Sequence, residues 1–397
     1  MISVEGKLSW FNNPYKDSSD AYPGELEVII SLQKSRKAVS EITRWPDYAP
    51  TPLYSLENLA KAIKISKLWY KDESQRFGLK SFKALGGAYA VARQLQLYIK
   101  NTTGVEPELP VLLERKYDEI VSQVVISCAT DGNHGRSVAW GCQLFGCACV
   151  IYIHRDVSRV RQRAMEALGA EVVRISGNYD DSVRQAAVDA EQYGRTIVSD
   201  TSYAGYMDIP KDVALGYTVL LAEAVEQMAG EIPSHVFIQG GVGGLASTVC
   251  AYFWELWGER RPRFIVVEPE QANCLQQSAR AGKPVVVMGD LDTLMAGLAC
   301  GEVSALAWKI LKVGADDFLT LNEKAVPNTM RLLAGGFEGD PRIEAGESAV
   351  AGLAALISAR NSPEISEQLA LDESSRVFVL GTEGATDPEL YQRLIKE

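Results

Sequence analysis

The stretch VVISCATDGNHGRSVAWGCQLFGCACVIYIH, residues 124–154, sets one helix between two short apolar runs. Residues 124–131 and 148–154 are rich in β-branched residues and have the length of buried strands. Between them, residues 132–146 follow a small polar turn and read as a helix. A strand, a crossover helix and a second strand predict neighbouring parallel strands, covered by helices on both faces.

The alternation of strands and helices continues along the rest of the chain. Further strands are expected at 171–177, 235–241, 263–270 and 376–384, and further helices at 157–170, 212–228, 242–258 and 346–360. Because these elements form two series, we expect two α/β domains. The turn-rich residues 199–211 are where we expect the two series to divide.

The composition is that of a globular protein whose ligand is a small molecule. Of 397 residues, 47% are hydrophobic and 23% are charged, and the net charge is −11. Nucleic-acid binding needs a basic face, which this charge balance does not offer. The first residues show no signal-peptide core, and no window reaches the ~18 apolar residues of a membrane span. We therefore expect a cytoplasmic protein that binds neither nucleic acid nor membranes.

The cysteines and histidines do not form a metal-binding pattern. The chain has seven cysteines without C-x-x-C spacing, and its three histidines are His134, His154 and His235. Because this spacing is not that of a metal site, we expect no metal. Thiols stay reduced in the cytoplasm, so we expect no lasting disulfide. Whether Cys274 and Cys300 pair is left open by the sequence.

A glycine-rich turn, QGGVGGLAS at residues 239–247, joins an expected strand to an expected helix. Its backbone N–H groups lie at a helix N-terminus without side chains over them, an arrangement that suits a phosphate. The residues expected to contact the phosphate are Gly240, Gly241, Val242, Gly243 and Gly244. Two alternatives remain: a purely structural turn, or a G-x-G-x-x-A dinucleotide fingerprint with Glu268 as the ribose-binding acid.

A second turn, SCATDGNHGRS at residues 127–137, also lies between a strand and a helix. Thr130, Asn133 and the N–H groups of Gly132 to His134 are donors that suit a carboxylate or a ring oxygen. Asp131 is the one acid among these donors. It is either the N-cap of the helix, a common role for aspartate, or a functional carboxylate.

The third feature is Lys83, in FGLKSFKALGGAY at residues 77–89. Ser81 is the expected helix cap, which puts Lys83 in the first helical turn, where a cation is mildly unfavourable. Most lysines are simply solvated. A lysine held at a positive helix end and partly desolvated has its neutral amine favoured, as a Schiff-base nucleophile requires.

A Schiff-base lysine, a phosphate-binding turn and a turn for an amino-acid carboxylate together indicate pyridoxal 5'-phosphate (PLP). The stretches SFKALGGAY, TDGNHGRSVAW, GGVGGLA and GTEGATDP, in this order, resemble the signatures of fold-type II (tryptophan synthase β-like) PLP-dependent lyases. They extend from about residue 70 to residue 388. Within that superfamily they are most similar to the diaminopropionate ammonia-lyases. Threonine and serine dehydratases share the S-F-K and G-N-H stretches but generally have a small residue where this chain has Asp131.

The resemblance implies two domains, each with a mostly parallel twisted sheet flanked by helices. Residues 1–83 with 205–397 would form the large cofactor-binding domain and 84–204 the small one, with the active site in the cleft between them. A homodimer is also implied.

The resemblance also implies roles for single residues. Lys83 would form the Schiff base, Asn133 would contact the ring hydroxyl, and Gly240 to Gly244 would hold the phosphate. Thr382 would face the ring nitrogen, although Gly381 occupies the place where some relatives have a serine. Thr130, Gly132 and His134 would bind the substrate carboxylate.

The function that the resemblance implies is α,β-elimination of 2,3-diaminopropionate, in both its D and L forms, to pyruvate and two ammonia. Lys83 would remove the α proton of the L-isomer, and Asp131 would act on the D-isomer and on the departing nitrogen. A serine or threonine dehydratase on the same fold is the alternative. A nucleotide-binding oxidoreductase or regulatory module built on GVGGLA is the more distant one.

Overall fold

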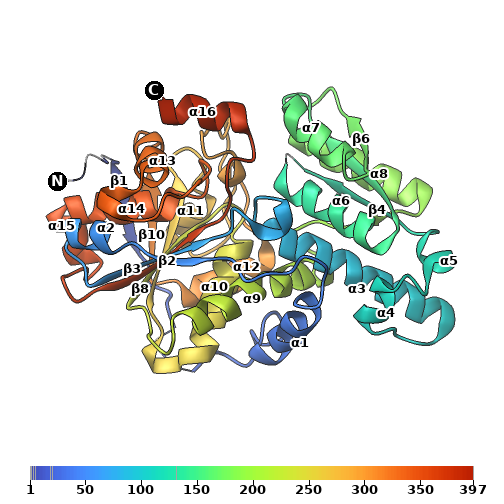
Figure 1. The fold of residues 1–397 in the computed structure, drawn as a ribbon, viewed down its shortest axis with the longest axis horizontal. Helices are drawn as coiled ribbons and strands as arrows, with labels where there is room; N and C mark the ends of the chain where they lie inside the picture. Colours follow the sequence, from blue (N-terminus) through green and yellow to red (C-terminus); the bar gives the residue numbers. More distant parts are fainter. Residues whose placement is uncertain are drawn as a thin grey trace. The chain divides into compact units, whose positions relative to one another are not determined.

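The computed structural model describes residues 2, 4, 6–17, 19, 21–130 and 132–396. The chain forms two compact units, and each has its own sheet (Figure 1). Unit 1 comprises residues 1–32, 50–80 and 220–397, and unit 2 comprises 33–49 and 81–219. In the part of the chain that the model describes, no helix has the length and hydropathy needed to cross a membrane.

Unit 1 is built on a seven-stranded sheet in the order β1-β10-β9-β8-β11-β3-β2. The strands from β10 to β3 are parallel, while β1 and β2 pair antiparallel at the two edges. The strands are β1 (Leu8–Asn12), β2 (Leu53–Ser55), β3 (Lys67–Asp72), β8 (His235–Gln239), β9 (Arg263–Pro269), β10 (Asp317–Leu321) and β11 (Arg376–Gly381). The helices are α2 (Glu57–Ala62), α10 (Gly244–Trp257), α11 (Cys274–Ala281), α12 (Ala305–Gly314), α13 (Ala325–Gly335), α14 (Ala351–Asn361), α15 (Pro363–Gln368) and α16 (Pro388–Lys396), with short 3-10 turns at Arg76–Gly78, Gly258–Arg260, Ala296–Leu298 and Phe337–Gly339.

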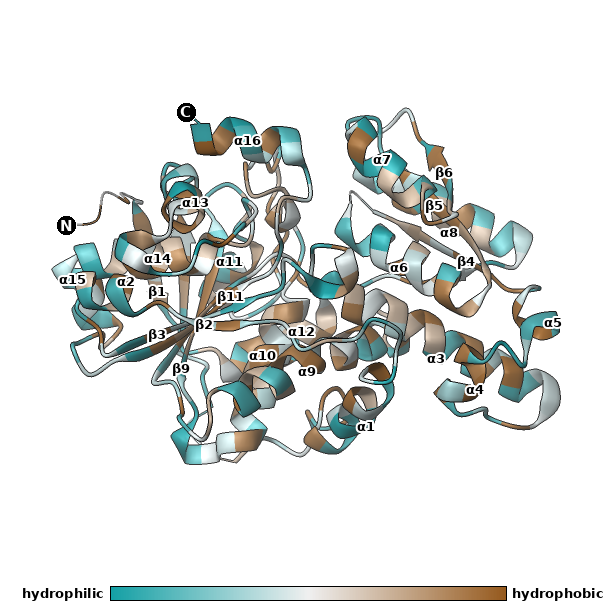
Figure 2. Ribbon diagram, viewed as in Figure 1, coloured by the Kyte–Doolittle hydropathy of each residue, from teal (hydrophilic) through white to brown (hydrophobic). Residues whose placement is uncertain are grey.

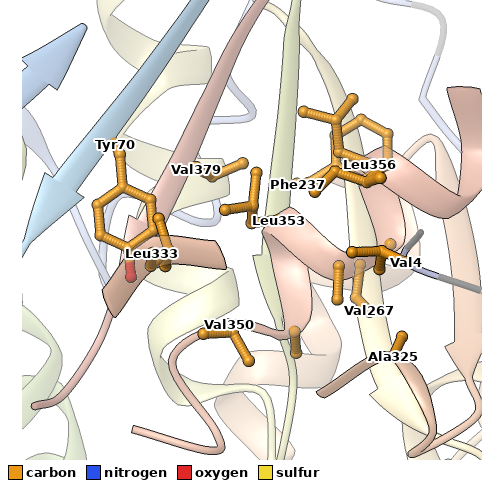
Figure 3. Packing of buried hydrophobic residues seen from close by; sticks show 14 of the residues in the cluster. Val4, Tyr70, Phe237, Val267, Ala325, Leu333, Val350, Leu353, Leu356 and Val379 are labelled. Atoms are coloured by element: carbon orange, nitrogen blue, oxygen red, sulfur yellow. The ribbon is translucent and has the colours of Figure 1, made fainter. Parts of the chain in front are cut away.

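Alternating residues of β11 show how the sheet of unit 1 is covered on both faces. Val377 and Val379 belong to the core that α14 closes, together with Leu353 and Leu356 (Figure 3). Phe378 points to the other face and packs edge-on against Phe253 of α10. A strand buried on both faces reads as a continuous apolar run, and Figure 2 shows brown along several strands of this sheet, as well as on parts of the helices.

Unit 2 has a four-stranded, wholly parallel sheet in the order β6-β5-β4-β7. Its strands are β4 (Val125–Ala129), β5 (Ala148–Ile153), β6 (Glu171–Arg174) and β7 (Thr196–Ile197). Its helices are α1 (Leu32–Ile42), α3 (Lys83–Thr103), α4 (Leu109–Leu113), α5 (Asp118–Val121), α6 (Asn133–Phe145), α7 (Arg159–Glu166), α8 (Tyr179–Tyr193) and the first part of α9 (Asp208–Gln227), which continues into unit 1. Helices α6 and α8 pack on β4 and β5.

The predicted α/β class and the parallel sheets are confirmed, and so is the β4-α6-β5 stretch that opened the prediction. The chain passes between the units at 32/33, 49/50, 80/81 and 219/220, whereas the predicted domains meet at 83/84 and 204/205. Residues 33–49, predicted in the large domain, lie in unit 2 because Trp45 packs against Trp140 and Phe145 of α6. Tyr217 likewise packs against Phe82, which keeps the first part of α9 in unit 2.

A buried ionic cluster in unit 1 holds the segment that follows β3. The Arg76 guanidinium donates to Glu73 at 2.8 and 2.9 Å and to Glu223 at 2.7 Å twice, and Lys71 Nζ donates to Glu223 at 2.7 Å. All four side chains are at most 5% exposed. A buried ionic cluster adds little net stability compared with apolar packing. It holds its side chains in one arrangement, because a charge that lost its partner would be buried and unpaired. It therefore fixes the backbone shortly before the stretch that carries Lys83.

Candidate active site

Lys83 is the first residue of α3, and its amine is held by neighbours within unit 2. Its backbone N–H donates to Ser81 Oγ at 3.3 Å, but the N-cap of α3 is Phe82, one residue after the predicted Ser81. Its Nζ donates to the Asp200 carboxylate and lies 5.5 Å from the centre of the Phe82 ring. The side chain is 25% exposed, so the amine is partly desolvated but reachable from solvent.

Asp200 is the principal residue of this site that sequence reasoning missed. It follows β7, at the carboxyl edge of the small sheet, where ligands bind in open α/β folds. Burial alone would raise the pKa of Asp200, but the charges of Lys83 and His134 lower it well below its ordinary value. The carboxylate therefore stays ionised at neutral pH. The sequence signal that could have revealed it is an acidic residue shortly after a short strand. Asp200 lies within residues 199–211, which were interpreted only as the boundary between the domains.

The turn between β4 and α6 is shaped by Thr130. Its hydroxyl oxygen accepts the backbone N–H groups of Gly132 and Gly135, both at 3.2 Å. His134 hydrogen-bonds through Nε2 to Val198 O at 2.9 Å. His134 Nδ1 is buried, lies 3.9 Å from Asp200 Oδ2 and has no hydrogen-bond partner among the residues that the model describes. A polar atom of this kind suits a bound ligand.

Unit 2 thus brings Lys83, His134 and Asp200 together. Asn133 begins α6 as predicted, and Gly132 lies directly before it. Asp131, predicted to be catalytic, lies outside the described residues.

The glycine turn in unit 1 joins β8 to α10. Gly243 has φ +95° and is the N-cap of α10, where no described side chain provides a cap hydrogen bond. A Cβ on Gly240 would lie 2.6 Å from Leu275 Cδ1, and one on Gly241 would lie 3.1 Å from Cys300 Sγ. These positions therefore need glycine for close packing as well as for an open helix N-terminus. The turn fits a phosphate held by the backbone N–H groups of Gly241 to Gly244, whereas the Gly240 N–H already donates to Val267 O at 2.8 Å.

Thr382 lies beside Gln239, the last residue before the glycine turn. Its Oγ1 accepts a hydrogen bond at 3.0 Å from the side-chain amide of Gln239, the residue before Gly240, and Thr382 is 4% exposed. A Cβ on Gly381 would lie only 2.2 Å from the Tyr70 hydroxyl oxygen, so there is no room for a serine at residue 381. Packing therefore favours Thr382 over residue 381 as the hydroxyl next to the glycine turn.

Glu268 does not play the ribose-binding role that the dinucleotide alternative gave it. It is fully buried at the end of β9, and its two carboxylate oxygens accept the N–H groups of Leu275 and Gln276, each at 2.7 Å. With both oxygens bound to the start of α11, the carboxylate is not available to two ribose hydroxyls. That alternative is wrong for Glu268.

Cys274 and Cys300 are both free thiols. Cys274 Sγ donates to Gly241 O at 3.6 Å, which ties α11 to the glycine turn. Within the described residues, no group of three or more His, Cys, Asp or Glu side chains is placed to hold a metal ion.

We expect Gly243→Ala to destabilise the protein and weaken cofactor binding together. The left-handed φ of Gly243 costs an L-residue about 1–2 kcal/mol, and the new Cβ would lie 3.1 Å from Ala307, Leu275 and Leu311 side-chain carbons. A shift of the turn to relieve these contacts would displace its N–H groups. Urea unfolding of the apoprotein and PLP titration measure the two effects.

Gly230→Ala is the matched control for Gly243→Ala. Gly230 also has a left-handed φ, +89°, but its Cβ would meet nothing within 4 Å. This variant should lose stability through backbone strain alone and bind PLP normally. Unchanged PLP affinity in Gly243→Ala, with a stability loss like that of the control, would make the turn merely structural.

The chain is similar to known proteins over nearly its whole length. The family model described as "Pyridoxal-phosphate dependent enzyme" matches residues 44–381. A diaminopropionate ammonia-lyase of Escherichia coli (strain K12) is 38% identical over 381 residues, which are 95% of this chain and 94% of the relative.

Solved structures of the Escherichia coli diaminopropionate ammonia-lyase give the same result. The crystal structure of its complex with D-serine matches with a TM-score of 0.90 and 35% identity, covering 99% of this chain and 97% of the other. Its complex with the aminoacrylate-PLP azomethine reaction intermediate matches with a TM-score of 0.88 and the same coverage.

Proposed function

The chain belongs to the pyridoxal-phosphate dependent enzyme family, and from this premise we propose that it removes ammonia from 2,3-diaminopropionate. The products are pyruvate and two molecules of ammonia, and both the D- and the L-isomer are substrates. The observation that carries the choice of substrate is the 38% identity to a diaminopropionate ammonia-lyase over 95% of the chain. The complex of that relative with D-serine supports a site that admits D-amino acids.

Each unit supplies residues that suit one part of PLP. The open glycine turn at Gly240 to Gly244 would hold the phosphate, and Lys83, with its partly exposed amine, would bond to the cofactor carbon. Asn133 would contact the ring hydroxyl and Thr382 the ring nitrogen. When bound, PLP supplies an electron sink that stabilises negative charge at the substrate Cα. A neutral hydroxyl as ring partner makes a weaker sink than a carboxylate would, which suits elimination more than transamination.

Lys83 would remove the α proton of the substrate, and Asp200 would stabilise the positive charge that Lys83 then carries. When the Lys83 amine takes this proton, it becomes an ammonium directly beside an ionised carboxylate. An opposite charge already in place stabilises the charge that develops, without reorganisation of water. Asp200 also holds Nζ in place through this hydrogen bond. Lys83 is therefore the general base in this proposal, and Asp200 its orienting and stabilising partner.

The substrate carboxylate would bind at the turn of Thr130, Gly132 and His134. The N–H groups at the start of α6 carry the partial positive charge of a helix N-terminus, and His134 Nδ1 offers a further polar atom. Asp131 belongs to the same turn in sequence. It would either attract the second ammonium of the substrate, which leaves as neutral ammonia, or protonate that nitrogen as it departs if it is a neutral amine. The released enamine hydrolyses to pyruvate and the second ammonia.

The test of this function is pyruvate release from D- and L-diaminopropionate, serine and threonine by the purified holoenzyme. We expect the highest kcat/KM on the two diaminopropionate isomers. Faster turnover of serine or threonine would favour the dehydratase alternative instead, and no pyruvate from any of the four would contradict both. Cytoplasmic localisation and a homodimer stay predictions; size-exclusion chromatography with light scattering tests the dimer.

A further inference from the structure

Helix α11 begins without a cap of its own. Its N-cap residue, Asn273, makes no side-chain cap hydrogen bond. Instead the Glu268 carboxylate accepts the N–H groups of Leu275 and Gln276 at 2.7 Å each, from a strand that precedes the helix. Because the first N–H groups of a helix have no partner inside the helix, this carboxylate completes the start of α11.

The residues at the start of α11 contact three of the four glycines in the phosphate turn. A Cβ on Gly240 would lie 2.6 Å from Leu275 Cδ1, and a Cβ on Gly243 would lie 3.1 Å from Leu275 Cδ2. Cys274 Sγ donates to Gly241 O at 3.6 Å. The first two residues of α11 therefore form the wall against which the glycine turn packs.

The start of α11 is also bound to the sheet of unit 1. The Gln276 side-chain amide donates to Ser9 O and to Phe318 O, both at 3.1 Å, on the neighbouring strands β1 and β10. The helix start is thus held between the sheet and the glycine turn. At this end of the helix, Glu268 accepts the N–H groups of Leu275 and Gln276.

We propose that Glu268 is a positioning residue for the cofactor phosphate, which acts by fixing the start of α11 behind the glycine turn. Leu275 transmits the effect, since its N–H is bound to Glu268 and its side chain packs on Gly240 and Gly243. This inference rests on the proposed placement of the phosphate at Gly240 to Gly244. It concerns cofactor binding and does not depend on which amino acid the enzyme uses.

The chemistry of a carboxylate is what the position requires. Each oxygen accepts one N–H group, while a glutamine could accept only one and would point an N–H donor at the other. Burial raises the pKa of Glu268 to about 8, and the hydrogen bonds from the Leu275 and Gln276 N–H groups oppose that rise.

The test uses Glu268→Gln, with Glu270→Gln as its matched control two residues further on. Glu270 is exposed and accepts a hydrogen bond only from Asn322 among the bonds described. PLP is titrated into the apoprotein, the bound cofactor is examined by ³¹P NMR, and the unfolding temperature of the apoprotein is measured. These readouts do not involve turnover, so they stay informative if the proposed substrate is wrong.

We expect Glu268→Gln to weaken PLP binding about 10-fold to 100-fold, by analogy with the loss seen when hydrogen-bond partners of metal ligands are removed. The ³¹P signal should shift, while Glu270→Gln should leave affinity and signal unchanged. Unchanged affinity and an unchanged ³¹P signal in Glu268→Gln would overturn the proposal. A lower unfolding temperature with normal PLP binding would overturn it too, since the role would then be structural only.

Two further variants keep the proposal testable if Glu268→Gln does not fold. Glu268→Asp retains both acceptor oxygens but withdraws them by one methylene, and it should weaken PLP binding in the same direction. Leu275→Val leaves the carboxylate in place and removes part of the contact with Gly240 and Gly243. Normal PLP affinity in Leu275→Val would show that the effect does not pass through α11 and would overturn the route proposed.

Discussion

Lys83→Ala is expected to abolish turnover and the borohydride-sensitive absorbance of the bound cofactor together. The change removes the amine that would bond to the cofactor and the base that would take the α proton. The loss should be on the order of 10⁴-fold or more, since removal of a general base alone costs up to about 10⁴-fold. Pyruvate release and absorbance spectra of the purified variant measure both effects. Full activity in this variant would contradict the proposed chemistry.

Lys80→Ala is the control for this experiment. Lys80 lies three residues earlier in the chain. It pairs with Glu344 at 3.0 Å, with both side chains 41% exposed. An exposed pair of this kind contributes about 0.2–1 kcal/mol, so the variant should fold and turn over nearly normally. A comparable loss in both variants would remove the special role of Lys83.

Asp131→Asn should separate the two enantiomers of the substrate. Asparagine caps a helix as well as aspartate does, so the change keeps a cap role and removes the charge and the proton transfer. If Lys83 serves the L-isomer and Asp131 the D-isomer, activity on D-diaminopropionate should fall about 10²–10⁴-fold and activity on the L-isomer much less. Pyruvate release from each pure enantiomer gives the ratio. Equal, small losses on both isomers would return Asp131 to the role of a helix cap.

The parts of the fold that sequence reasoning predicted are those with local signals. The strand ranges 148–154 and 376–384 became β5 and β11, because short β-branched runs bounded by turns are read from neighbouring residues alone. Helix boundaries were less well predicted. The helix expected at 157–170 forms only at Arg159–Glu166, because Ser158 caps its start, with Arg161 N–H donating to Ser158 Oγ at 3.3 Å.

The antiparallel edge strands were not predicted, because their pairing depends on partners far away in sequence. β1 pairs with β10 through contacts such as Trp10 Nε1 to Asp317 Oδ1 at 2.9 Å, across some 300 residues. A short strand of five residues carries too little local pattern to reveal such a partner.

The candidate site divides in the same way. Lys83 and the glycine turn were found because their chemistry is visible within a few residues of sequence. Asp200 and Glu268 act on residues that the fold brings to them, Asp200 on an amine 117 positions earlier. Glu268 was noticed at the end of its strand, but its partners on α11 show that it caps a helix. Long-range partners of this kind cannot be read from one sequence.

The identity of the lysine that carries the cofactor tests the central claim most directly. The holoenzyme is reduced with borohydride, which fixes the cofactor to its lysine, then digested, and the peptides are analysed by mass spectrometry. We predict a phosphopyridoxyl group on the peptide that contains Lys83, with fragment ions that assign it to that residue. A phosphopyridoxyl group on Lys80, Lys71 or any other lysine, or on none, would contradict the account.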